Sequence, residues 1–193
     1  GLQAYRLDTH VVEAYNGTAW GPLVAAGGLV LVQDDTAFSA QASVSTNAIF
    51  TSAYKDYLLM VDISAASVDD AALRLRLRAA GADITAANYS NGGTTHVIGA
   101  TTIGARNSLA GDYWTPINLN GADNNMLSMR IIAPFATNKT KIGWEAYGRI
   151  GGSQGGTNGT GEYNATTSAD AVTVYPASGT ITGRLKVFAY VNA

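Results

Sequence analysis

The chain has 193 residues, no cysteine and a formal net charge of −2. Only 13% of its residues are charged, which argues against the clustered lysines and arginines that attract nucleic acid or an anionic membrane. The lack of cysteine excludes a disulfide framework and any metal site built on thiolates. Because 47% of the residues are hydrophobic, the chain can still bury a large core, and its length suits one large β-sandwich.

The first 26 residues predict a small module of their own. Two short stretches, 4–8 and 11–15, read as paired strands, and Asn16-Gly17 is a turn signal because both residues tolerate positive φ. Small residues then predict a linker with a boundary near residue 26. We therefore predict an N-terminal β-hairpin module over residues 1–26 and a main domain over residues 27–193.

The main domain predicts strands and no helix. Apolar runs with a period of two, or continuous, recur between turn signals at residues 29–32, 38–49, 57–63, 73–79, 95–103, 127–133, 141–150, 171–175 and 180–191. In the clearest run, 73–78, every Leu falls on one face and every Arg on the other. These patterns predict an all-β fold, a jelly-roll-like two-sheet antiparallel sandwich. The glycine-rich stretch 151–161 has no such pattern and predicts a mobile loop.

Three stretches carry distinctive motifs: AYRLDTHVVEAYNGTAW at 4–20, IFTSAYKDY at 49–57 with GADITAANY at 81–89, and YPASGTITGRLKVFAY at 175–190. Together they resemble the host-facing domains of tailed-phage tail fibre and minor tail proteins. The resemblance implies a virion structural protein, assembled in the bacterial cytoplasm and carried on the extracellular particle. It further implies a homotrimer that contacts other virion proteins and a host surface polysaccharide.

A search for catalytic patterns finds none that predicts an enzyme. The two histidines, His10 and His96, lie far apart in sequence, and no nucleophile, phosphate-loop or dinucleotide fingerprint is present. The acid pairs Asp34-Asp35 and Asp69-Asp70 fall between strands, where Asp caps turns. Glycoside cleavage and surface Ca²⁺ binding are the alternatives for them. We predict no catalytic residue, no cofactor and no metal, and neither nucleic-acid binding nor membrane insertion.

Aromatic residues in loops are the stronger candidates for ligand binding, because sugars offer apolar ring faces together with hydroxyls. Asp112, Tyr113 and Trp114 lie in a predicted loop at 107–125, and Tyr163 follows the glycine-rich stretch. Packing is the alternative for all of these. Trp144 and Tyr147, in an alternating strand, are predicted to be core residues.

The arginines at 74, 76 and 78 have three interpretations: pairing with acids on a neighbouring strand, contact with an anionic glycan, or a subunit interface. Three functions stay open for the whole chain. The first is host attachment through glycan binding. The second is a purely architectural role as a capsid decoration, head fibre or tail joint. The third is a polysaccharide depolymerase or its carbohydrate-binding module.

Overall fold

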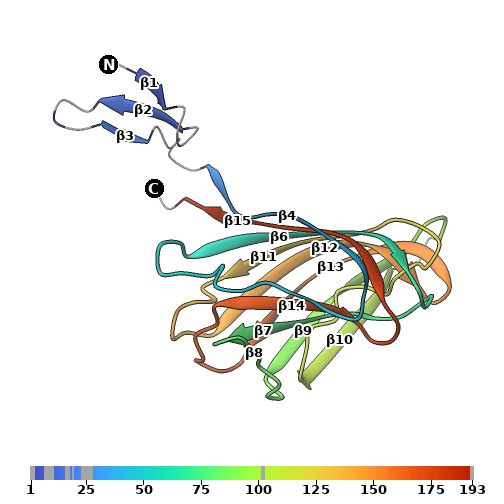
Figure 1. Ribbon diagram of the computed structural model, residues 1–193. Helices are drawn as coiled ribbons and strands as arrows, with labels where there is room; N and C mark the ends of the chain where they lie inside the picture. Colours follow the sequence, from blue (N-terminus) through green and yellow to red (C-terminus); the bar gives the residue numbers. More distant parts are fainter. Residues whose placement is uncertain are drawn as a thin grey trace.

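The computed structural model describes residues 3–6, 11–15, 18, 20–22, 28–100 and 103–191. Within these ranges the regular structure consists of β-strands without any helix, and the strands form sheets of three, eight and four members (Figure 1). In the same ranges, no helix is long and apolar enough to cross a membrane.

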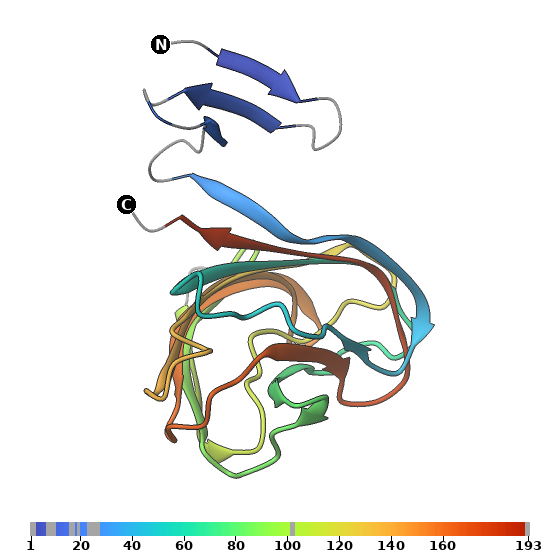
Figure 2. The same cartoon turned by 60° about the vertical axis from the view of Figure 1, so that its left-hand side comes forward.

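The smallest sheet is antiparallel and lies at the N-terminus, beyond the first residues of β4 (Figures 1 and 2). It consists of β1 (Gln3–Arg6), β2 (Val11–Tyr15) and β3 (Trp20–Pro22). The predicted turn at Asn16-Gly17 and the predicted boundary near residue 26 lie outside the described residues.

The other two sheets form a sandwich. The large sheet has the order β10-β9-β13-β12-β11-β6-β15-β4, and the small sheet has the order β5-β14-β7-β8. The strands of the large sheet are β4 (Leu29–Gln41), β6 (Asp56–Ala66), β9 (Tyr89–Val97), β10 (Ile103–Gly111), β11 (Asn125–Ile132), β12 (Thr140–Ile150), β13 (Ser153–Tyr163) and β15 (Ile181–Tyr190). Those of the small sheet are β5 (Val44–Ser45), β7 (Leu73–Ala79), β8 (Ala82–Asp83) and β14 (Ala171–Pro176).

Figure 2 shows the large sheet curving over the small one. Buried side chains of both sheets form the core between them. The paired strands are antiparallel throughout both sheets. The all-β, two-sheet antiparallel sandwich predicted from the sequence is thereby confirmed. Its description as jelly-roll-like stays a prediction.

The core follows from alternation along the central strands. In β6, Tyr57, Leu59, Val61 and Ile63 are each at most 1% exposed, because they all point toward the small sheet. The predicted alternation at 73–78 is confirmed in β7, whose leucines are buried while its arginines face outward and are half-buried. The two sheets therefore share one continuous hydrophobic core.

The glycine-rich stretch 151–161 is not a loop, and that prediction was wrong. Gly151 and Gly152, both at positive φ, turn the chain from β12 into β13, which then runs between β12 and β9 in the large sheet. The glycines are needed because a Cβ at Gly159 would collide with the Trp144 ring of β12 and lie 2.5 Å from the Gly92 carbonyl oxygen of β9.

The strand expected over 95–103 is also corrected. β9 ends at Val97 and its partner β10 begins at Ile103, so that stretch contains a connection between two strands. The run of apolar residues there supplies exposed side chains, among them Ile98 and Ile103. Apolar content without a strict period of two therefore misled the prediction.

Candidate functional site

The four residues predicted to bind a ligand separate into two groups. Trp114 and Tyr163 are each 1% exposed and both pack against Tyr89, with ring centroids 4.9 Å and 4.8 Å from it. The Trp114 Nε1 donates a hydrogen bond of 3.2 Å to the carbonyl oxygen of Glu162. These two side chains belong to the core, which favours the packing alternative for them over contact with a ligand.

Strand pairing explains why Trp114 is buried while its neighbour is not. The backbone of Trp114 pairs with that of Leu75 in β7, with both N···O distances at 3.0 Å. Paired residues share a face, so Trp114 points inward with Leu75. Tyr113 consequently points outward, on the same side as Arg74 and Arg76.

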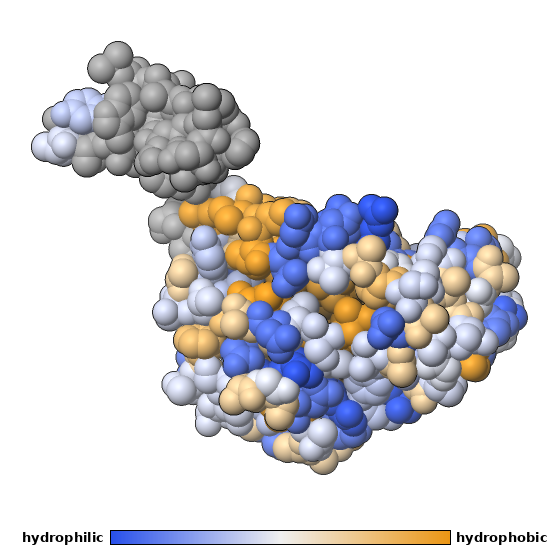
Figure 3. Space-filling model, in the orientation of Figure 1, coloured by the Kyte–Doolittle hydropathy of each residue, from blue (hydrophilic) through white to orange (hydrophobic). Residues whose placement is uncertain are grey.

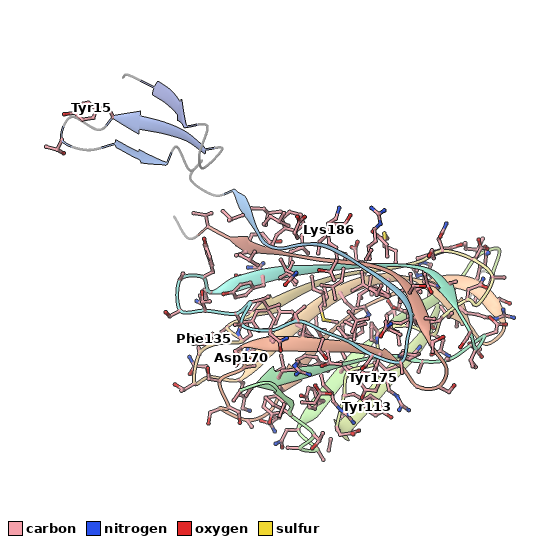
Figure 4. The ribbon with its side chains drawn as sticks, viewed as in Figure 1. Tyr15, Tyr113, Phe135, Asp170, Tyr175 and Lys186 are labelled. Atoms are coloured by element: carbon pink, nitrogen blue, oxygen red, sulfur yellow. The ribbon has the colours of Figure 1, made fainter. Side chains whose placement is uncertain are left out.

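Asp112 and Tyr113 do come together with other polar side chains on the outer face of the small sheet. We call this cluster the arginine–tyrosine surface, and it consists of Arg74, Arg76, Asp112, Tyr113 and Tyr175. Tyr175 of β14 is the register partner of Arg74, so β7 carries its arginines between Tyr175 on one side and Tyr113 on the other. Figure 4 shows the two tyrosines near each other on the side of the sandwich away from β4.

The rings and guanidinium groups of this surface are in direct contact. The guanidinium carbon of Arg74 lies 4.1 Å from the ring centroid of Tyr113, and that of Arg76 lies 5.0 Å from the centroid of Tyr175. The two tyrosine rings meet edge to face, with centroids 6.5 Å apart. Both guanidinium distances are within the range of cation–π attraction, so each arginine head is held against a tyrosine ring.

The three outward arginines of β7 differ in their polar partners. Arg76 forms an ion pair with Asp112 and also donates from Nε to the Asp112 carbonyl oxygen at 2.9 Å. Arg78 donates to the Asp83 carboxylate at 2.7 Å and to the Ser45 hydroxyl at 2.9 Å. Among the described residues, Arg74 has neither an acid nor a hydrogen-bond acceptor. The predicted pairing with acids thus holds for Arg76 and Arg78 but not for Arg74.

Two buried polar atoms of the surface lack partners. They are the hydroxyl oxygen of Tyr175 and the Nε of Arg74. Groups of this kind are rare in folded proteins and often mark a place where water or a ligand binds. Burial raises the pKa of Tyr175 to about 12, although Arg76 acts in the opposite direction. The hydroxyl therefore stays protonated at neutral pH and can donate a hydrogen bond.

This pKa leads to a prediction for alkaline solutions. In an ultraviolet titration of tyrosinate, the difference between the native chain and a Tyr175→Phe variant should show one group that ionises near pH 12 rather than near its usual 10.0. Because the folded pKa lies above the unfolded one, Tyr175 stabilises the fold fully below pH 10.0, and that contribution is lost as the pH rises toward 12. A difference spectrum that titrates near pH 10.0 would contradict the burial of this hydroxyl.

Of the acid pairs singled out in the sequence, Asp69-Asp70 lies between β6 and β7 as predicted, whereas Asp34-Asp35 lies within β4, so the prediction of a turn there was wrong. Asp69 accepts a hydrogen bond of 3.0 Å from the Gly121 amide and pairs with Arg149, and these contacts, the first above all, lower the pKa of its carboxyl. Asp35 lies 2.9 Å from Arg184. In the described part of the chain, no three His, Asp or Glu side chains gather as a metal site would require.

A hollow lies over the large sheet. It measures about 650 Å³, and its lining includes Asp62, Met126, Tyr147 and Arg184. Tyr147 is half-buried there and not a core residue as predicted, since Trp144, three positions earlier in the same strand, points to the other face. The Tyr147 hydroxyl already donates a hydrogen bond of 3.0 Å to the side-chain oxygen of Gln154. The tyrosine of this hollow therefore has a hydrogen-bond partner within the protein.

Comparison with known proteins gives a clear result. No protein-family model, no curated protein and no solved structure matches this chain. The function is therefore inferred from the residues of the arginine–tyrosine surface and from the sequence motifs at 4–20, 49–57 and 175–190.

Proposed function

We propose that this chain is a structural domain of a bacteriophage tail fibre, spike or similar virion appendage, and that the arginine–tyrosine surface contacts a glycan of the host surface. The viral origin is supported by the resemblance at 4–20, 49–57 and 175–190. A sandwich made of strands with little net charge suits a role outside the cell, where a rigid scaffold presents a binding face.

One observation carries the glycan contact. The guanidinium carbon of Arg74 lies 4.1 Å from the centroid of the Tyr113 ring and, among the described residues, has no acid as a partner. Such a surface offers apolar ring area together with preplaced donors, and sugars present the matching combination of apolar ring faces and polar groups. The only carboxylate within it, Asp112, is occupied by Arg76. Glycoside cleavage requires two carboxylates facing the sugar, so the surface favours binding without catalysis.

An array of bacterial surface polysaccharides tests this proposal. The native chain should bind a subset of the array, and a Tyr113→Ala variant should lose about tenfold or more in affinity, because the support of Arg74 is removed. A Tyr147→Ala variant is the matched control, since it removes a half-buried tyrosine from the opposite sheet. Binding to no polysaccharide, or equal binding by the Tyr113→Ala variant, would contradict the proposal.

Exposed apolar side chains favour an architectural role as the second candidate. Leu29 and Leu31 are each 47% exposed, and Leu109 on the edge strand β10 is 84% exposed. Figure 3 shows apolar side chains gathered near the start of β4 and the end of β15. Patches of this kind suit contacts with other virion proteins or with further copies of the chain in a homotrimer. Light scattering that finds only monomer at micromolar concentration would count against the homotrimer.

A further inference from the structure

We infer that the arginine–tyrosine surface recognises a carboxylate group, and that its ligand is a glycan containing an acidic sugar of the uronic or sialic acid class. This inference rests on the proposed glycan contact and adds the chemical class of the ligand. It is carried by the guanidinium of Arg74, which is held in place but has no acid of its own.

The charges around this position leave an excess of one positive charge. Arg76 is neutralised by Asp112, and Arg78 on the same strand is neutralised by Asp83. Arg74 remains with its full charge in a setting that is partly shielded from water. An arginine in such a setting is more favourable when an anion accompanies it, since the cost of desolvation is then offset.

The available donors fit a planar anion. A guanidinium presents parallel N–H groups in a fixed fork that matches the two oxygens of a carboxylate. Tyr175, the register partner of Arg74, has a buried hydroxyl, so the donors offered to the ligand are those of the guanidinium. Tyr113 acts as a positioning residue, because its ring lies against the guanidinium.

Nuclear magnetic resonance titration of the full chain tests the inference with defined probes. The probes are the methyl glycosides of glucuronic, galacturonic and N-acetylneuraminic acid, each beside its carboxyl-reduced counterpart. At least one acidic glycoside should shift the Nε–H resonance of Arg74, which is identified by its loss in an Arg74→Gln variant. The reduced counterpart should bind about tenfold more weakly or worse, because a charge-assisted hydrogen bond is lost.

Two variants separate recognition from a general effect of charge. Arg74→Gln should abolish the preference for the acidic glycoside, whereas Arg184→Gln removes an equal charge from the large sheet and should leave it unchanged. Tyr175→Phe should leave the binding of both glycosides unchanged, because the buried hydroxyl is not offered to the ligand. Retained melting temperatures for all variants would show that the fold is intact.

Several results would overturn the inference. If a reduced glycoside binds as tightly as the acidic one, and Tyr113→Ala still lowers binding on the polysaccharide array, the glycan contact stands but the carboxylate does not. If none of the glycosides shifts the Arg74 resonance, the inference fails as well. Binding of poly-glutamate in preference to every acidic sugar would assign the surface to an acidic protein partner instead.

Discussion

Replacing Trp114 with alanine should lower the free energy of unfolding by about 3–5 kcal/mol, the cost typical of removing a large aromatic residue from a core. Trp114 is 1% exposed, contacts Tyr89 edge to face and donates a hydrogen bond to the Glu162 carbonyl oxygen. Its loss would leave a cavity between the two sheets and an acceptor without its donor. Chemical denaturation followed by circular dichroism measures the change.

The neighbouring residue provides the control. Tyr113→Ala should cost about 1–2 kcal/mol, less than Trp114→Ala, because the half-buried side chain loses a cation–π contact with Arg74 and an edge-to-face contact with Tyr175 but leaves no cavity in the core. If the two variants lose equal stability, Trp114 and Tyr113 cannot point to opposite sides of the segment. A loss of glycan binding by Trp114→Ala, taken alone, would therefore report on folding and not on ligand contact.

Replacing Gly159 with alanine should destabilise the fold by about 1–3 kcal/mol or more, since it forces overpacking in the middle of the large sheet. The new Cβ would collide with the ring of Trp144 and lie 2.5 Å from the Gly92 carbonyl oxygen. Neither neighbour can move freely, because the ring is enclosed in the core and the oxygen belongs to the backbone of β9. Thermal unfolding should show a lower melting temperature.

A glycine in the adjacent strand is the matched control for this prediction. At Gly143 a Cβ would meet only the Gly159 carbonyl oxygen at 3.9 Å, an ordinary contact. Gly143→Ala should consequently change the stability by less than about 1 kcal/mol, or increase it slightly by restricting the unfolded chain. Equal effects of the two substitutions would show that β13 does not pack against β9 and β12 as described.

The sequence allowed the sandwich to be predicted wherever one face of a strand is buried. The alternation of Leu and Arg at 73–78 gave both the strand and its inner face, and β7 has that arrangement. The glycine-rich strand could not be predicted in this way, because glycine has no side chain and so shows no alternation of apolar and polar residues. Gly159 is required because Trp144 and Gly92 leave no room for a Cβ. These two residues belong to β12 and β9, which lie next to β13 only through the register of the sheet.

The sequence predicted two residues of the candidate site, Asp112 and Tyr113, but not Tyr175. Tyr113 and Trp114 were treated as a pair, although adjacent residues of an extended segment point to opposite sides, which alone predicts that at most one of them is at the surface. Tyr175 was missed as a site residue because its role depends on being opposite Arg74 across two strands separated by nearly a hundred residues. Arg76 and Arg78 have acidic partners and Arg74 has none, because of where Asp112 and Asp83 lie in the fold. The local sequence around the three arginines does not predict those positions.

The most direct test of the central claim is a crystal structure of the chain with a bound oligosaccharide that contains an acidic sugar. The carboxylate of the sugar should lie within hydrogen-bond distance of the Arg74 guanidinium, which itself lies against the Tyr113 ring. An oligosaccharide bound instead in the hollow of the large sheet, beside Tyr147 and Asp62, would contradict it.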